Sequence, residues 1–161
     1  MLPLPPAART DLAFIDYVYG TSSSSAFSYR AGGDYYDIPV AFSCSYVCTD
    51  DVANRVFTMD ITDRQLRRVW SNFVPGAIVA SDTGIFSAMQ GVTSEFESDA
   101  NIGTLGLPTY VLQNPYQIRA YCLGAALLDT MEEPILTLLR IPTGGPATTG
   151  PSTATPVLAL T

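Results

Sequence analysis

Apolar and polar residues alternate along the middle of the chain, and a period of two is typical of β-strands with one buried face. In the clearest run, one face carries Val40, Phe42, Cys44, Tyr46 and Cys48. In the next run, 54–62, we expect Phe57, Met59 and Ile61 to point inward and Thr58 and Asp60 to point outward. Residues 66–70 then form the returning arm of a hairpin.

Further segments extend this pattern to about eight strands. We expect strands at 12–19, 84–96, 107–112, 116–124 and 134–141, with a loop at 98–106. The 107–112 segment is assigned to a sheet edge because Pro108 cannot donate to a ladder. One helix candidate, 120–131, overlaps this series. Frequent turns between short strands predict an all-β domain, either a single antiparallel β-sandwich or a small barrel.

The two ends of the chain differ from this domain. Residues 1–10 are rich in proline, and residues 143–161 are rich in proline, threonine and glycine, with an apolar tip at 157–160. We therefore expect an extended N-terminal arm at 1–10, a sandwich at 11–142 and a flexible C-terminal arm at 143–161. An apolar tip on a flexible tether is expected to dock on a neighbouring subunit, and a frayed terminus without a role is the alternative.

Composition narrows the classes of function. The 161 residues are 47% apolar but only 14% charged, with a net charge of -7 and only eight basic residues. Nucleic-acid binding and anionic membranes both require a basic surface, so neither is expected as a partner. Histidine is absent, which removes Ser–His–Asp and Cys–His catalysis and most zinc chemistry. Composition therefore favours binding or assembly over catalysis.

The cysteines do not form a disulfide pattern. Cys44, Cys48 and Cys122 are an odd number, and the first two would lie about 13 Å apart along a strand. A disulfide needs Cα atoms within about 7 Å, so we expect buried thiols. No apolar stretch approaches the roughly 20 residues of a membrane-crossing helix, and the first residues do not have the pattern of an export signal.

Several motifs admit a catalytic or ligand-binding interpretation. Asp82-Thr83-Gly84 contains the core of aspartic-protease sites, but Asp-Thr-Gly is also ordinary turn chemistry before a strand, which we prefer. The acidic pairs 50–51, 95/97 and 132–133 are interpreted as a solvated face rather than a calcium or glycosidase site. The basic cluster 64–68 is either a solvated turn or a contact for an acidic partner. Tyrosines crowd the first quarter of the chain, which suits an interface or a sugar-binding groove.

A family resemblance rests on the middle of the chain. The run Asn54-Arg55 to Ile61-Thr62-Asp63, followed by Val69-Trp70, resembles a segment of capsid decoration (cement) proteins of tailed bacteriophages. Leu107-Pro108, Asn114-Pro115, 116–119 and the final strand 135–141 extend the likeness over about residues 38–142. The resemblance implies a jelly-roll-like sandwich without catalytic activity. It also implies dimers or trimers that sit outside the shell and tie capsomers together.

We therefore expect a viral structural protein on the capsid exterior of the virion, made in the host cytoplasm and released by lysis. Its expected partners are the major capsid protein and itself, with no nucleic acid, membrane, metal or cofactor. The expected interface residues are Leu2, Leu4, Arg9, Tyr17, Tyr19, Arg67, Arg68, Val157, Leu158 and Leu160. The alternatives are a head-fibre base, neck or tail protein, a carbohydrate-binding sandwich used in adhesion, and a hydrolase that uses Asp82.

Overall fold

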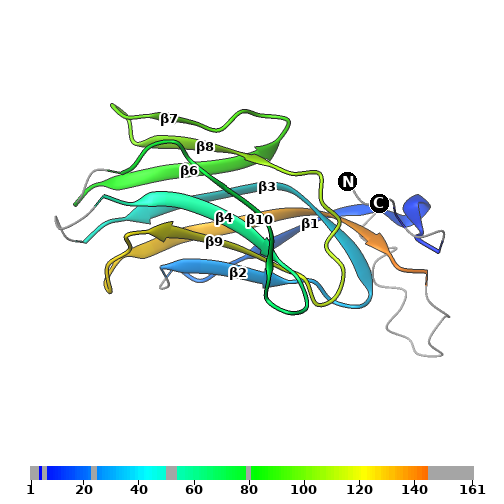
Figure 1. Cartoon of the computed structure of the whole chain (residues 1–161). Coiled ribbons are helices and arrows are strands. Elements are labelled where there is room, and N and C mark those ends of the chain that lie inside the picture. The colour runs from blue at the N-terminus through cyan, green and yellow to red at the C-terminus, as the bar shows by residue number, and fades with distance from the viewer. Residues whose placement is uncertain (1–3, 5–6, 23–24, 50–53, 79–80, 145–161) are drawn as a thin grey trace.

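The protein is a two-layer β-sandwich, which confirms the predicted all-β class (Figure 1). The computed structural model describes residues 4, 7–22, 25–49, 54–78 and 81–144. The strands are β1 (Phe14–Tyr19), β2 (Ala26–Arg30), β3 (Tyr35–Val47), β4 (Val56–Thr62), β5 (Arg68–Phe73), β6 (Thr83–Gln90), β7 (Glu95–Glu97), β8 (Ile102–Leu107), β9 (Gln117–Leu123) and β10 (Thr130–Pro142). A single 3-10 turn, Thr10–Leu12, is the only helical element among the described residues, and it is far too short to cross a membrane.

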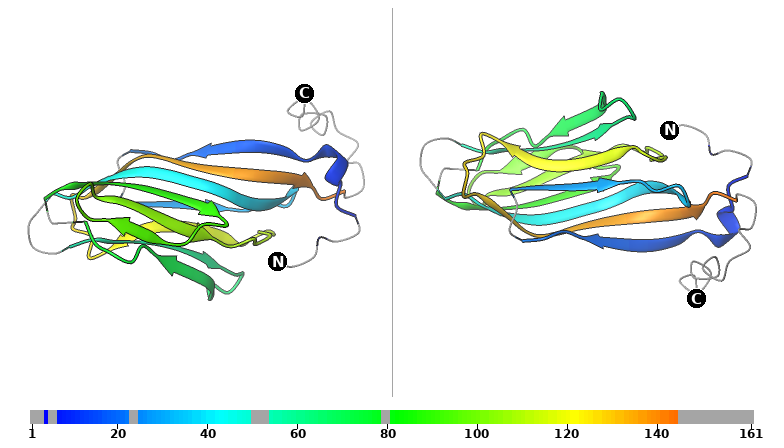
Figure 2. Two further views of the ribbon diagram at one scale, coloured as in Figure 1. Left: turned by 90° about the horizontal axis from the view of Figure 1, so that it is seen from above. Right: turned by 90° about the horizontal axis from the view of Figure 1, so that it is seen from below.

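The strand order is that of a jelly roll. One sheet has the order β1-β10-β3-β6-β8-β7 and the other has the order β2-β9-β4-β5, and the views in Figure 2 show the two layers from above and below. The antiparallel pairs β1·β10, β2·β9, β3·β6 and β4·β5 amount to one long hairpin rolled into two sheets. Strands β7 and β8 extend the larger sheet, and β8 runs parallel to β6, a departure from the purely antiparallel expectation.

Aromatic side chains join the two sheets across the core. Phe57 of the four-stranded sheet stacks on Phe86 of the six-stranded sheet, with ring centroids 4.5 Å apart and planes 7° from parallel. Phe42 of β3 also stacks on Phe57, with ring centroids 6.1 Å apart. The predicted inward face of β4 is confirmed, and that of β3 is confirmed from Phe42 to Cys48, since these positions are buried. Val40 is only partly buried, because the pairing of β3 with β10 shifts register there. Burial of large apolar side chains is the main stabilising contribution to such a core.

The predicted helix at 120–131 is wrong. Residues up to Leu123 belong to β9, which pairs with β2 on one side and β4 on the other. Gly124 then adopts a positive φ of 80° and ends the strand, and β10 begins at Thr130. The apolar residues of this segment follow the strand period, with Ile118, Ala120 and Cys122 buried, so sheet pairing decides the conformation.

Three other boundaries differ from the prediction. The segment 84–96 is two strands rather than one, because the chain turns at Gly91, where φ is 76°. The expected loop at 98–106 contains β8, whose glycines hide the strand pattern. The expected strand at 107–112 is irregular beyond Leu107, with a single bridge between Leu112 and Asp37. The predictions at 12–19, 116–124 and 134–141 correspond to β1, β9 and β10.

Candidate functional site: the two outer sheet faces

The outer face of the six-stranded sheet carries no basic side chain among the described residues. Alternation along β1 turns Ile15, Tyr17 and Tyr19 outward, where they are exposed. The exposed apolar side chains on β6 and β8 are Ile85, Met89 and Ile102. We define the uncharged face by these six residues and the small residues between them.

The strand register makes this surface continuous. One row of directly paired residues crosses five strands in the order Tyr17, Thr137, Ala41, Met89 and Gly106. Exposed carboxylates lie at its rim, with Glu95 and Glu97 on β7 and Glu132 near the start of β10, where it pairs with Ser45. A surface with apolar and tyrosine side chains at its centre and charge at its rim is typical of protein interfaces.

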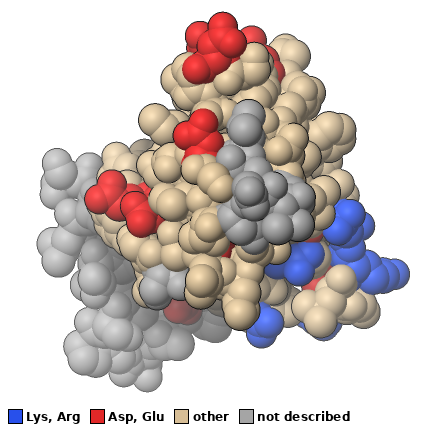
Figure 3. Space-filling model, turned by 90° about the vertical axis from the view of Figure 1, so that its left-hand side faces the viewer, with Lys and Arg blue, Asp and Glu red and all other residues tan. Residues whose placement is uncertain are grey.

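The outer face of the four-stranded sheet has the opposite character. All eight basic residues of the chain are arginines, and five of them, apart from the buried Arg55, lie on or beside this sheet. We define the arginine face by these five: Arg30, Arg64, Arg67, Arg68 and Arg119. In Figure 3 the blue side chains gather at one side of the molecule, apart from most of the red ones. The face is therefore a positive area on a protein of net charge -7.

Asp60 lies at the centre of the arginine face and is fully buried. Its carboxylate accepts two hydrogen bonds from Arg119, from Nε at 2.8 Å and Nη2 at 2.6 Å, and one from the Tyr121 hydroxyl at 3.0 Å. The Arg68 Nε lies 3.4 Å away. Thr58 and Asp60 point outward, as predicted, but both are buried, because side chains of neighbouring strands, among them Arg119 and Tyr121, cover this outward face.

This arrangement perturbs the groups around the carboxylate. The hydrogen bond to Asp60 raises the pKa of the Arg119 guanidinium. Burial raises the pKa of the Tyr121 hydroxyl, and the hydrogen bond to Asp60 raises it further. Two guanidinium groups therefore share one carboxylate, which leaves a surplus of one positive charge at this position.

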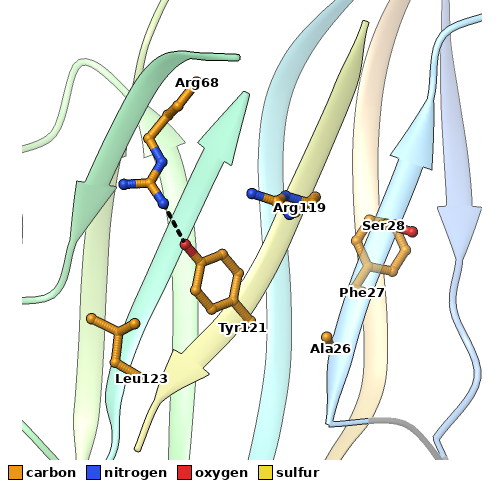
Figure 4. A pocket seen from close by; sticks show the side chains of 7 residues that line it. All are labelled: Ala26, Phe27, Ser28, Arg68, Arg119, Tyr121 and Leu123. Carbon is orange, nitrogen blue, oxygen red and sulfur yellow. Dashed lines mark hydrogen bonds between the residues drawn. The ribbon is translucent and has the colours of Figure 1, made fainter. Parts of the chain in front are cut away.

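A shallow pocket of about 610 Å³ opens beside these residues (Figure 4). Its lining is Ala26, Phe27, Ser28, Arg68, Arg119, Tyr121 and Leu123. The Arg68 side chain reaches across to the Tyr121 hydroxyl, and the ring of Tyr121 lies between Arg68 and Leu123. The pocket could accommodate an acidic side chain or the hydroxyl groups of a sugar.

The structure separates the interface residues that the sequence predicts. Tyr17 and Tyr19 lie on the uncharged face, whereas Arg67 and Arg68 lie on or beside the opposite sheet. Arg67 binds Asp63 within its own turn, with its Nη2 2.8 Å from the carboxylate.

The terminal interface residues fall in or near the ends of the chain. Leu4 packs beside a small apolar cluster of Ile38, Val111 and Ile141. The Arg9 side chain pairs with Asp11, and its N–H donates to the Pro142 carbonyl. Leu2, Val157, Leu158 and Leu160 lie outside the described residues.

The residues singled out for possible chemistry occupy structural positions. The Asp82 carboxylate accepts hydrogen bonds from the Thr83 N–H at 2.9 Å and the Asn101 side chain at 2.7 Å, in the turn before β6. The cysteines are buried thiols, as predicted, and desolvation raises the pKa of Cys44 to about 12. No group of three or more Cys, Asp or Glu side chains within the described ranges is placed to hold a metal ion.

A buried ion pair, which the sequence did not predict, lies at one end of the sandwich. Arg55 and Asp129 are both fully buried, with Arg55 Nε 2.7 Å from the carboxylate. Asp129 also accepts hydrogen bonds from the backbone N–H groups of Thr49 and Ala126. The pair therefore ties the end of β3, the start of β4 and the turn before β10 together. Sequence offered no signal for it, because 74 residues separate the two partners.

Comparison with known proteins adds no family to these observations. No protein-family model matches the chain, and none of the curated proteins matches it.

Proposed function

We propose that this chain is a viral structural protein, a decoration or cement protein that binds the outer surface of a phage head and bridges neighbouring capsomers. The observation that carries the proposal is the uncharged face, which presents Tyr17, Ile85, Met89 and Ile102 on one rigid sheet. A rigid, weakly charged surface suits a permanent contact with another protein, because little charge is desolvated on binding. Jelly rolls recur in viral capsid proteins, although that analogy alone assigns no function.

The opposite character of the two faces supports a bridging role. A protein that ties neighbouring subunits needs two separate contact surfaces. The uncharged face offers apolar contact, and the arginine face offers Arg68 and Arg119 to acidic groups. Binding to the assembled shell would then stabilise it by mass action and slow the escape of subunits. The partners in this proposal are the major capsid protein and further copies of this chain.

The location follows from the same proposal. The protein would be made in the host cytoplasm and would occupy the capsid exterior of the virion. The proposed function involves no nucleic acid, membrane, cofactor or catalysis. A head-fibre base, neck or tail protein would use the same surfaces, but at a few copies for each particle rather than hundreds.

Co-sedimentation with heads that lack this protein tests the proposal. The intact chain should bind saturably and at high copy number, and should raise the temperature at which the heads break open. A chain that ends at Gly144 tests the contribution of residues 145–161, which we expect to strengthen binding. Saturation at a few copies would instead support a neck or tail component, and no binding would refute the virion role.

A carbohydrate-binding protein is the second candidate, supported by the pocket beside Tyr121. An aromatic ring flanked by arginines can bind a sugar through stacking and hydrogen bonds. Trp70, on β5 of the same sheet, packs against the core and is only partly exposed. A glycan array should separate the two candidates, because sugar binding must be lost in Tyr121→Ala and kept in Tyr19→Ala.

A further inference from the structure

Among the residues that the structure describes, strand β1 pairs only with β10, so it forms an open edge of the six-stranded sheet. The Gly20 N–H donates to the Pro134 carbonyl at 2.8 Å, next to the last pair of that ladder. Backbone groups alternate sides along an antiparallel strand, so the even-numbered residues face β10. Ile15, Tyr17 and Tyr19 therefore direct their N–H and C=O groups toward the open edge. Consistent with this, the Tyr17 N–H bonds only to the neighbouring Asp16 carboxylate, at 2.9 Å.

This edge has less protection than the other edges. Proteins block open edges with exposed charges, prolines or very short strands. Strand β2 ends in the exposed Arg30, β5 begins with the exposed Arg68, and β7 has three residues, two of them glutamates. Strand β1 has six residues and no proline, and its one charge, Asp16, is paired with Arg140 at 2.9 Å. Its edge is therefore suited to pairing with another strand.

We propose that two copies of this protein pair through β1, antiparallel and about a twofold axis. A closed pair of this kind uses the same surface on both partners. The side chains select the register. Tyr17 lies opposite its own counterpart on the axis, Ile15 lies opposite Tyr19, and Asp16 lies opposite Val18. Ile15 and Tyr19 then exchange backbone hydrogen bonds across the axis, and the Tyr17 N–H gives up its bond to the Asp16 carboxylate for one to the Tyr17 carbonyl of the second copy.

Other registers are less favourable. A shift of one residue would set outward side chains against inward ones. A shift of two residues in one direction places Asp16 opposite Asp16, and like charges directly across a ladder are destabilising. A shift of two in the other direction places Val18 on the axis and shortens the overlap of the two strands. A second copy therefore fits the edge in one register better than in the others.

The pairing extends the uncharged face. The two six-stranded sheets would become one continuous sheet, and the exposed rings of Tyr17 and Tyr19 would meet those of the partner on a single surface. This inference stands apart from the role in a virion, because the dimer would form in solution without any capsid. Each copy carries a net charge of -7, so added salt should raise the dimer fraction by screening the repulsion between copies.

Disulfide trapping tests the register. Tyr17→Cys places two thiols across the axis, where directly paired residues have Cα atoms about 5.5 Å apart, inside the range of roughly 4.4–6.8 Å for disulfides. In Ile15→Cys the two thiols would be displaced by four residues, about 13 Å along the strands. Ile85→Cys is a control matched in exposure, since Ile85 and Tyr17 are each 54% exposed. The native cysteines are buried and give little background.

We expect oxidation to link Tyr17→Cys into dimers at least tenfold faster than either control. Sedimentation equilibrium should show the untreated wild-type chain as a dimer in the micromolar range. Tyr17→Lys should weaken the affinity of dimerisation at least tenfold, whereas Ile85→Lys should not. A wild-type chain that stays monomeric across that range would overturn the proposal. Equal cross-linking of all three cysteine variants, or a dimer insensitive to Tyr17→Lys, would overturn it as well.

Discussion

Replacing Asp129 with alanine removes the carboxylate that holds one end of the sandwich together. Both Asp129 and Arg55 have fully buried side chains, and the carboxylate accepts hydrogen bonds from Arg55 Nε at 2.7 Å and Nη2 at 3.0 Å. Desolvation alone would raise the pKa of Asp129, but the hydrogen bonds from Arg55, Ala126 and Thr49 outweigh it and hold the pKa well below its ordinary value. The substitution therefore leaves the buried Arg55 charge without this partner.

The expected loss of stability is large. Removing one partner of a buried ion pair costs about 3–5 kcal/mol, against a total unfolding free energy of about 5–15 kcal/mol for a domain. For a chain of this length each kcal/mol lowers the melting temperature by about 2–4 °C. Asp129→Ala should therefore melt roughly 6–20 °C below the wild type.

Urea unfolding followed by Trp70 fluorescence and far-UV circular dichroism measures the effect. The double variant Arg55→Met/Asp129→Leu should recover most of the loss, because an apolar pair of similar volume avoids the desolvation of both charges. Asp11→Ala breaks the exposed pair with Arg9 and serves as the control, with no measurable change in midpoint expected. A cost below about 1 kcal/mol for Asp129→Ala, the range of an exposed pair, would refute the reasoning.

The remaining predictions address pH and the core. The pKa of Asp129 in the folded chain lies below the ordinary value of 3.8. The stability that the ionised carboxylate contributes is therefore complete above about pH 4 and is lost as the pH falls further. The urea midpoints at pH 7 and pH 3 should differ more in the wild type than in Arg55→Met/Asp129→Leu. A Cβ at Gly103 would lie 2.6 Å from the Phe86 ring, so Gly103→Ala should lower the unfolding free energy by about 1–3 kcal/mol, whereas Gly32→Ala, with open space around it, should not. Phe57→Ala removes a buried ring that stacks on two others, Phe42 and Phe86, and should cost about 3–5 kcal/mol in the same assay.

Much of the fold followed from the sequence because the apolar period is strong where a strand has one buried face. The runs at 40–48 and 54–62 show this period clearly, and β3 and β4 lie there. The pattern failed where glycine replaced the outward or inward side chains. Gly103 and Gly106 removed the alternation from β8, and Gly91 divided a segment whose apolar residues suggested one long strand.

The candidate surfaces were only partly predictable. The exposed tyrosines of β1 were predicted as interface residues because tyrosine suits interfaces. That they lie on the same side of the molecule as Ile85 and Met89 depends on the order of the strands in the sheet. The burial of Asp60 depends on the pairing of Asp60 with Arg119 across β4 and β9. Such contacts join residues far apart in the chain, so no local pattern reveals them.

The measurement that tests the central claim most directly is binding to heads that lack this protein, with one charge placed on each face in turn. Ile85→Lys changes the uncharged face, and Leu123→Lys changes an equally exposed apolar position on the opposite sheet, at 54% and 53% exposure. We predict that Ile85→Lys weakens saturable binding at least tenfold. Leu123→Lys should change it less than threefold, because a lysine there adds to the positive charge that the arginine face offers to acidic groups. Undiminished binding by Ile85→Lys at the full copy number would contradict the account.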